Sequence, residues 1–136
     1  MNKVVLDTNI VNYLIKGENI WKNYNELLNK NNVSNYEDWV LSFATITELF
    51  LWIIKDRSIE SSIISLIELC PMAPTNISLC RKTAELANRI SRERYKSKWH
   101  DIWIASTAIE YRFPLVTNNY EDFKIFEDYG LVIWNI

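Results

Sequence analysis

Short apolar segments alternate with longer segments of helical spacing along most of this chain. The first of them, Lys3 to Leu6, is rich in β-branched residues and ends at a polar cluster, which is the pattern of a buried strand. Further short strands are expected at Trp39 to Ser42, Pro114 to Thr117 and Leu131 to Trp134. Strands that are apolar on both faces need helices on both sides. The pattern therefore predicts an α/β fold, namely a three-layer α/β/α sandwich with a short, mainly parallel sheet.

Apolar residues recur at helical spacing between these strands. Thr8 or Asn9 is expected to cap the first helix. Further helices are expected over residues 44–55, 58–69, 77–94, 101–112 and 121–126, with a polar helix or loop over 18–38. The residues expected on the inner face of the helix 44–55 are Ile46, Leu49, Phe50, Ile53 and Ile54. The segment Cys70 to Thr75 contains two prolines and is expected to be a short edge strand.

The length of 136 residues predicts one domain, 1–136, around a single core. An apolar content of 49% excludes a disordered chain. No apolar stretch approaches the roughly 20 residues that span a bilayer, so no membrane partner is expected. Cys70 and Cys80 lack the spacing of metal ligands. We expect reduced thiols in a cytoplasmic protein, with a disulfide as the alternative.

Three carboxylates lie in apolar surroundings far apart in the sequence. Asp7 ends the first apolar run, Glu48 lies within the apolar segment around Leu49, and Asp101 opens another. A buried ionised carboxylate must be paired, hydrogen-bonded or bound to a metal. The sequence offers none of the three an obvious partner. A shared divalent cation held by oxygen ligands is the simplest explanation.

The predicted topology brings these acids to one place. Asp7 follows the first strand, and Asn119 and Asp122 follow the strand at Leu115–Thr117. Ligands of open α/β sheets bind beyond the carboxyl ends of the strands. Asp101 stands at the start of a helix, where the helix dipole favours negative charge. An ion bound at this edge would polarise a phosphate, which predicts phosphodiester hydrolysis.

Each of these residues also has a purely structural explanation. Asp7 and Asp101 are common residue types at helix N-termini, and Glu48 fits a solvated helix face. His100 is the only histidine, which excludes a two-histidine zinc site. A serine or cysteine nucleophile paired with His100 is a further alternative, although no nucleophile-elbow motif accompanies it. The combined pattern favours the metal site.

A basic segment directly precedes Asp101. Residues 81–98 hold seven basic side chains and two acidic ones, a local net charge of +5 in a chain whose net charge is −2. A local basic surface is what a phosphate backbone binds, although a solvated helix face explains the same pattern. The residues that we expect to guide nucleic-acid phosphates toward the ion are Arg89, Arg92, Arg94, Lys96 and Lys98.

Four segments together resemble the PIN-domain family, and within it the VapC-like ribonuclease toxins of bacterial toxin–antitoxin pairs. The resemblance extends over essentially the whole chain. The segments are Val5-Leu6-Asp7-Thr8-Asn9, Thr45-Ile46-Thr47-Glu48-Leu49, the stretch from Asp101 to Ala108, and Leu115-Val116-Thr117-Asn118-Asn119 with Asp122-Phe123. Their order and spacing make the combination more specific than any single segment.

The resemblance implies a metal-dependent endoribonuclease that binds Mg²⁺ or Mn²⁺. It also implies a cognate antitoxin that covers the acidic pocket, and a homodimer. Asp7, Glu48 and Asp101 match the family's three acids. The family often has a fourth acid where this chain has Asn119. That difference weakens a second metal site or transfers the role to Asp122, with Thr117 in support by hydrogen bond.

Two other functions fit the same residues. A catalytically degenerate PIN-fold module would bind RNA or a partner protein without cleaving it, and Asn119 favours this alternative. A structure-specific DNA nuclease would use the same metal site on another substrate. The leading hypothesis remains a toxin that hydrolyses RNA.

Overall fold

The computed structural model describes residues 2–92 and 98–135 of the chain. Within these ranges, a four-stranded sheet has the strand order β2-β1-β3-β4, and every neighbouring pair is parallel. The strands are β1 (Val4–Leu6), β2 (Trp39–Val40), β3 (Leu115–Val116) and β4 (Ile133–Trp134). The predicted parallel α/β sheet is confirmed, with strands that are one or two residues shorter than expected.

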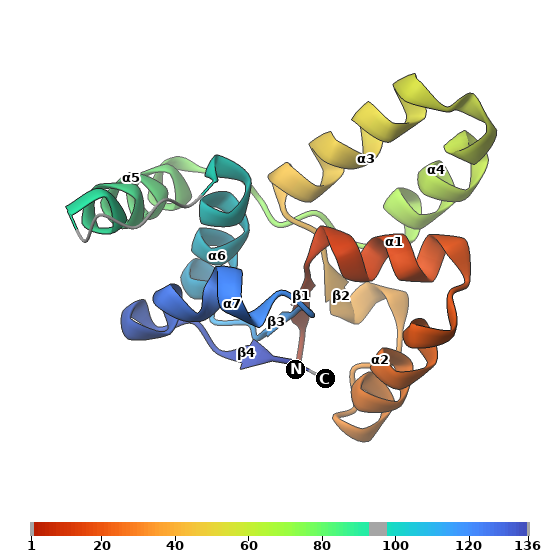
Figure 1. The fold of residues 1–136 in the computed structure, drawn as a ribbon, viewed down its shortest axis with the longest axis horizontal. Helices are drawn as coiled ribbons and strands as arrows, with labels where there is room; N and C mark the ends of the chain where they lie inside the picture. Colours follow the sequence, from red (N-terminus) through yellow and green to blue (C-terminus); the bar gives the residue numbers. More distant parts are fainter. Residues whose placement is uncertain (1, 93–97, 136) are drawn as a thin grey trace.

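Helices cover both faces of this sheet (Figure 1). The first half of the chain contributes α1 (Thr8–Lys16), α2 (Asn19–Lys30), α3 (Phe43–Lys55) and α4 (Glu60–Leu69). The second half contributes α5 (Ile77–Arg92), α6 (Trp99–Tyr111) and α7 (Tyr120–Phe123). Short 3₁₀ helices are η1 (Tyr36–Asp38), η2 (Arg57–Ile59) and η3 (Lys124–Tyr129). No helix in the described ranges is both long and apolar enough to cross a membrane.

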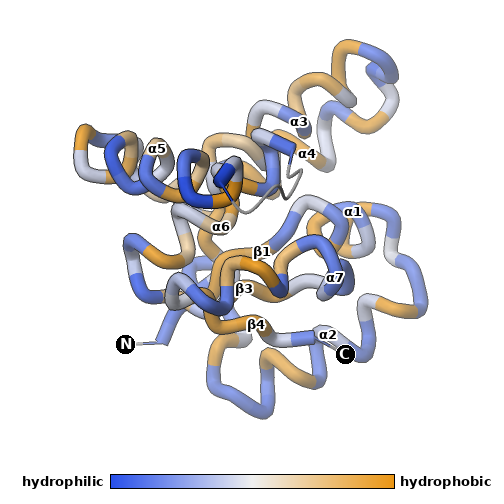
Figure 2. The backbone as a smooth tube through the Cα atoms, turned by 60° about the vertical axis from the view of Figure 1, so that its left-hand side comes forward, coloured by the Kyte–Doolittle hydropathy of each residue, from blue (hydrophilic) through white to orange (hydrophobic). Residues whose placement is uncertain are grey.

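The two faces of β1 belong to two different hydrophobic cores. Val4 and Leu6 pack into the core formed with α1 to α4, whereas Val5 packs into the core formed with α5, α6 and the α7–η3 segment. Alternate residues of a strand point to opposite faces of the sheet, so a fully buried strand contributes side chains to both cores. Figure 2 shows the central strands as hydrophobic segments between helices of mixed hydropathy. The predicted three-layer sandwich is confirmed.

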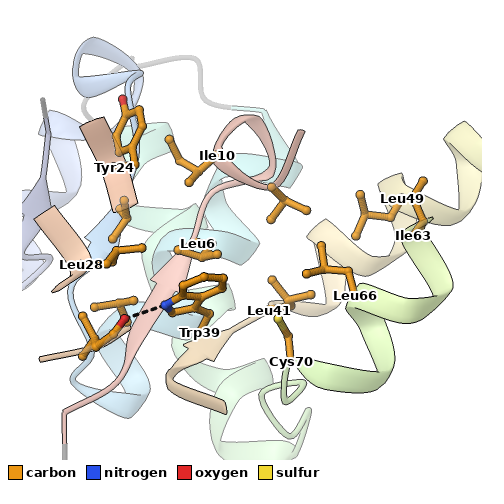
Figure 3. Packing of buried hydrophobic residues seen from close by; sticks show 14 of the residues in the cluster. Leu6, Ile10, Tyr24, Leu28, Trp39, Leu41, Leu49, Ile63, Leu66 and Cys70 are labelled. Atoms are coloured by element: carbon orange, nitrogen blue, oxygen red, sulfur yellow. Dashed lines mark hydrogen bonds between the residues drawn. The ribbon is translucent and has the colours of Figure 1, made fainter. Parts of the chain in front are cut away.

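The core on the α1–α4 side contains a buried tryptophan whose ring N–H makes a hydrogen bond. Trp39 is buried, and its ring Nε1–H donates to the backbone carbonyl of Val33 at 2.7 Å. Figure 3 shows this bond together with Leu6, Leu28 and Leu41 packed around the ring. Fully burying an apolar side chain of this size contributes about 2–3 kcal/mol. The packing fixes β1, and hence the position of Asp7 at its end.

Four expectations from the sequence are corrected. Cys70–Thr75 is not a strand; it forms only an isolated bridge between Leu41 and Met72. Pro71 has no N–H to donate, although its carbonyl accepts from Leu41. On α3, Leu49 and Ile53 are buried and Ile46 is half-buried, but Phe50 and Ile54 are 43% and 68% exposed.

The remaining two corrections concern helix starts. Asp7, and not Thr8 or Asn9, is the N-cap of α1, and its side chain accepts from the backbone N–H of Thr8. Helix α6 begins at Trp99, two residues earlier than expected, so Asp101 lies in its first turn. Cys70 and Cys80 are free, as expected of reduced thiols.

Candidate active site

Asp7 stands at the carboxyl end of the central strand β1 and is only 3% exposed. Its Oδ1 accepts from the backbone N–H of Thr8, and its Oδ2 accepts from the Thr117 hydroxyl, both at 2.7 Å. Thr117 follows β3, and its hydroxyl oxygen also accepts from the backbone N–H of Asn119 at 3.0 Å. Two neighbouring strand ends therefore hold one carboxylate by hydrogen bonds.

Burial dominates the electrostatics of Asp7 and raises its pKa to about 6. The hydrogen bonds from Thr117 and Thr8 lower the pKa, the charge of Asp101 raises it, and His100 lowers it. Burial also raises the pKa of Asp101, where Asp122 and Glu48 act in the same direction and His100 and Lys98 oppose them. The charges of neighbouring carboxylates therefore raise the pKa of Asp7 and of Asp101 across a shared space.

That space is a pocket of about 510 Å³ at the carboxyl edge of the sheet. It contains every acid or amide that the sequence predicted for the site. The predicted site residues that line it are Asp7, Glu48, Asp101, Asn119 and Asp122. Thr117 contacts Asp7 without lining the pocket. Segments separated by more than 100 residues in sequence thus meet at one place, as the topology predicted.

The pocket wall also contains residues outside the predicted set. Phe43 and Trp103 form part of its wall, with ring centroids 5.8 Å apart. Thr8 lines it too, and its hydroxyl oxygen lies 3.0 Å from that of Thr45 and 3.1 Å from Nε2 of His100. The same His100 nitrogen is 2.9 Å from Oε2 of Glu48. The sequence suggested a catalytic role for His100 only beside a serine or cysteine nucleophile, and the signal for its place here is that it directly precedes Asp101.

The basic residues predicted to guide RNA are only partly at the pocket. Lys98 lines it. Arg89 and Arg92 lie on the last turn of α5 outside the pocket lining, and the Arg89 guanidinium sits 5.4 Å from the ring centre of Tyr129. Arg94 and Lys96 lie outside the described residues. Helix α5 packs against α6, which carries Asp101, so Arg92 and the acidic pocket belong to adjoining helices.

The donor set fits a hard divalent cation. Among residues 2–92 and 98–135, neither Asp7 nor Asp101 forms an ion pair with lysine or arginine. The same part of the chain contains no ready group of three His, Cys, Asp or Glu side chains at metal-binding distance. Mg²⁺ needs only one or two direct carboxylates and takes its other ligands from water and substrate phosphate. Asp7 and Asp101 are two carboxylates that line the pocket.

Comparison with known proteins gives consistent results. The family model described as PIN domain matches residues 4–128. A curated relative, Ribonuclease VapC of Rickettsia bellii (strain RML369-C), is 29% identical over 127 residues, which cover 89% of this chain and 88% of the relative. The crystal structure of VapBC2 from Rickettsia felis, bound to a DNA fragment from its promoter, matches with a TM-score of 0.81. Identity there is 26%, and the match covers 98% of both chains.

A further structure supports the fold alone. A toxin–antitoxin complex from Klebsiella pneumoniae matches with a TM-score of 0.72 at 23% identity. That match covers 98% of this chain and 100% of the other. The similarity therefore extends over the whole of each molecule rather than one shared motif.

Proposed function

The chain belongs to the PIN domain family, and from that premise we propose that it is an endoribonuclease, the toxin of a toxin–antitoxin pair. The similarity to a curated Ribonuclease VapC over 89% of this chain supports RNA as the substrate. The reaction is hydrolysis of phosphodiester bonds. The whole of residues 1–136 forms one nuclease domain that acts in the cytoplasm, where Cys70 and Cys80 stay reduced.

The observation that carries this proposal is the pocket at the carboxyl edge of the sheet. Four carboxylates, those of Asp7, Glu48, Asp101 and Asp122, line one space of about 510 Å³. Like charges brought together in a partly buried site repel one another, and a divalent cation removes that repulsion. A bound Mg²⁺ or Mn²⁺ would also polarise the scissile phosphate and stabilise negative charge on its oxygens.

The chain's own residues take distinct roles in this proposal. Asp7 and Asp101 bind the cation directly, and Glu48 binds it directly or through water. Asn119 and Asp122 orient a water molecule in the same pocket. Thr117 fixes the Asp7 carboxylate through its 2.7 Å hydrogen bond, so the ligand is oriented before any ion arrives.

RNA approaches over the basic residues next to the pocket. Lys98 lines the pocket, and Arg92 is exposed at the end of the adjoining helix α5. A phosphate backbone that follows Arg89, Arg92 and Lys98 leads toward Asp101. Arg94 and Lys96, which lie outside the described residues, remain part of the proposed RNA-binding set.

Two protein partners belong to the proposal. An antitoxin binds the chain and covers the acidic pocket, in line with the similarity to VapBC2 over 98% of both chains. A second copy of the chain forms a homodimer. Exposed apolar side chains on α3 support a protein interface, since Phe43, Phe50, Leu51 and Ile54 are each more than 40% exposed.

The test is cleavage of single-stranded RNA by the purified chain with Mg²⁺ or Mn²⁺, with and without a chelator. We expect cleavage that the chelator abolishes and that Asp101→Asn also abolishes without loss of the fold. RNA binding without cleavage under every metal condition would instead support a degenerate binding module, which the uncharged Asn119 favours. Preferential cleavage of DNA in a mixed substrate assay would support a DNA nuclease.

A further inference from the structure

His100 joins three structural elements at the pocket. It is the second residue of α6, and its Nε2 lies 2.9 Å from Oε2 of Glu48 on α3. The same nitrogen lies 3.1 Å from the hydroxyl oxygen of Thr8 on α1. The His100 and Glu48 side chains are 31% and 33% exposed, so this contact lies in the partly buried wall of the pocket.

The partner atoms limit the tautomer of His100. Oε2 of Glu48 lies 2.9 Å from Nε2 of His100, a polar contact that is favourable when Nε2 carries the hydrogen. The Thr8 hydroxyl oxygen is close enough to share that N–H. Thr8 is itself held 3.0 Å from Thr45, which accepts from the Ser42 hydroxyl at 3.2 Å. The His100 imidazole therefore belongs to a hydrogen-bond network that reaches Ser42 and Thr45 at the start of α3.

Glu48 needs such a contact more than Asp7 does. Asp7 is 3% exposed and accepts hydrogen bonds through both carboxylate oxygens. Glu48 has a longer side chain, and its immobilisation costs up to about 2 kcal/mol of rotamer entropy. In the described part of the chain, Oε2 of Glu48 contacts Nε2 of His100 at 2.9 Å. His100 thus restrains one oxygen of the carboxylate.

We propose that His100 is a positioning residue that holds the Glu48 carboxylate in place for the divalent cation of the pocket. This inference rests on the proposed function, because it assumes the metal site. Hydrogen-bonded partners of ligating carboxylates orient them before the metal binds, and their loss typically costs about 10- to 100-fold in metal affinity or activity. His100 acts through Glu48 and does not itself bind the ion.

A double-mutant cycle on Mn²⁺ affinity tests this role. Mn²⁺ binding to the chain, purified without a histidine tag, is measured by electron paramagnetic resonance titration in the absence of RNA. His100→Phe keeps a planar ring and removes the N–H donor, so we expect Mn²⁺ to bind about 10- to 100-fold more weakly. His100→Gln should recover part of the loss, because its amide N–H can donate to the carboxylate. In a Glu48→Gln background, His100→Phe should cause no further loss.

The matched control removes a comparable hydrogen bond elsewhere. Ser78→Ala deletes the 2.5 Å bond from the Ser78 hydroxyl to the Glu110 carboxylate, which links α5 and α6 away from the pocket lining. It should leave the Mn²⁺ affinity unchanged. Thermal unfolding without metal checks that each variant folds, and His100→Leu replaces His100→Phe if the latter does not.

Two results would overturn the inference in distinguishable ways. Equal loss of Mn²⁺ affinity from His100→Phe with Glu48 and with Glu48→Gln would mean that His100 does not act through Glu48, and the proposed nuclease site would stand. Failure of the unaltered chain to bind Mn²⁺ would remove the metal site and the positioning role together.

Discussion

The two ends of the parallel sheet differ sharply in chemistry. At the carboxyl end, β1 leads to Asp7, which lines the acidic pocket, and β3 leads to Thr117, which donates a hydrogen bond to Asp7. At the amino end, a hollow of about 250 Å³ lies beside the starts of the same two strands, and its described lining includes Lys3 and Arg112 but no acid. Both hollows therefore border the same strands, yet only one collects carboxylates.

The direction of the strands explains this difference. In a parallel sheet all strands leave at one edge, where the chain turns into helix N-termini with free N–H groups and a positive dipole. Asp7 caps α1 there, and Asp101 lies in the first turn of α6. At the other edge the chain arrives from helix ends, as at Arg112, which ends α6 in the left-handed conformation with φ of 58°. Helix N-termini, which favour negative charge, therefore lie at the carboxyl edge, although burial outweighs this effect at Asp7 and Asp101.

The largest effect should come from removing one charge at each end. Asp7→Asn keeps the shape of the side chain and removes a proposed metal ligand, so we expect RNA cleavage to fall by about 1,000-fold, equivalent to about 4 kcal/mol. Lys3→Gln removes a charge at the amino end and should leave cleavage within about twofold. Initial cleavage rates with saturating Mg²⁺ measure both. Comparable losses of cleavage rate in Asp7→Asn and Lys3→Gln would show that the two ends of the sheet do not differ in function.

The stability of the fold should depend on pH because the ionised form of Asp7 is destabilised by burial. Its pKa rises from 3.8 to about 6 on folding, so the folded state binds the proton more tightly than the unfolded state. The free energy of unfolding of the metal-free chain should therefore fall as pH rises from about 4 to about 6, by up to about 3 kcal/mol. Asp7→Asn should lack that loss and be more stable than the unaltered chain at pH 7.5.

Urea unfolding of both proteins between pH 3.5 and 7.5, with divalent cations removed, gives the difference due to Asp7 alone. The two free energies should converge near pH 4, and Mg²⁺ at pH 7.5 should restore stability to the unaltered chain only. An unaltered chain more stable than Asp7→Asn at pH 7.5 without metal would show that burial does not penalise this carboxylate.

Two threonine substitutions compare a buried hydroxyl that contacts Asp7 with a buried hydroxyl outside the pocket lining. Thr117→Val removes the hydroxyl that donates to Asp7 and preserves shape, so we expect cleavage to fall about 10- to 100-fold through misplacement of the ligand. Thr83→Val removes an equally buried hydroxyl that donates to Leu79 within α5, and it should leave cleavage unchanged. Steady-state cleavage kinetics separate the two. Equal cleavage rates in Thr117→Val and Thr83→Val would mean that the Thr117 hydrogen bond does not position Asp7 for cleavage.

Hydrophobic patterning made the sheet predictable. The strand at Val4–Leu6 is continuously apolar because both its faces are buried, and the structure confirms it. Cys70–Thr75 shows the limit of the same reasoning. Its composition suits an edge strand, but Pro71 cannot donate to a ladder, and pairing stops after one bridge at Met72. Exposure of Phe50 and Ile54 was not predictable, because helical spacing cannot say whether an apolar face meets the core or a partner.

The convergence of the acids was predictable for a different reason. Topology places strand ends together whatever side chains they carry, so Asp7 and Asn119 had to meet at one edge. The contact between His100 and Glu48 has no such rule behind it. It depends on the crossing of α3 and α6 and on two side-chain rotamers, which neither periodicity nor spacing encodes.

The smallest effect concerns the basic approach to the pocket. Arg92→Gln in an Asp7→Asn background, in which we expect RNA cleavage to be about 1,000-fold slower, should remove one phosphate contact. The slope of log affinity against log salt should become shallower by about 0.7, a loss of about fivefold at 0.1 M salt. Lys3→Gln in the same background removes a charge at the amino end and should leave the slope unchanged. Fluorescence anisotropy with a labelled single-stranded RNA measures both, and an unchanged slope in Arg92→Gln would remove α5 from the RNA path.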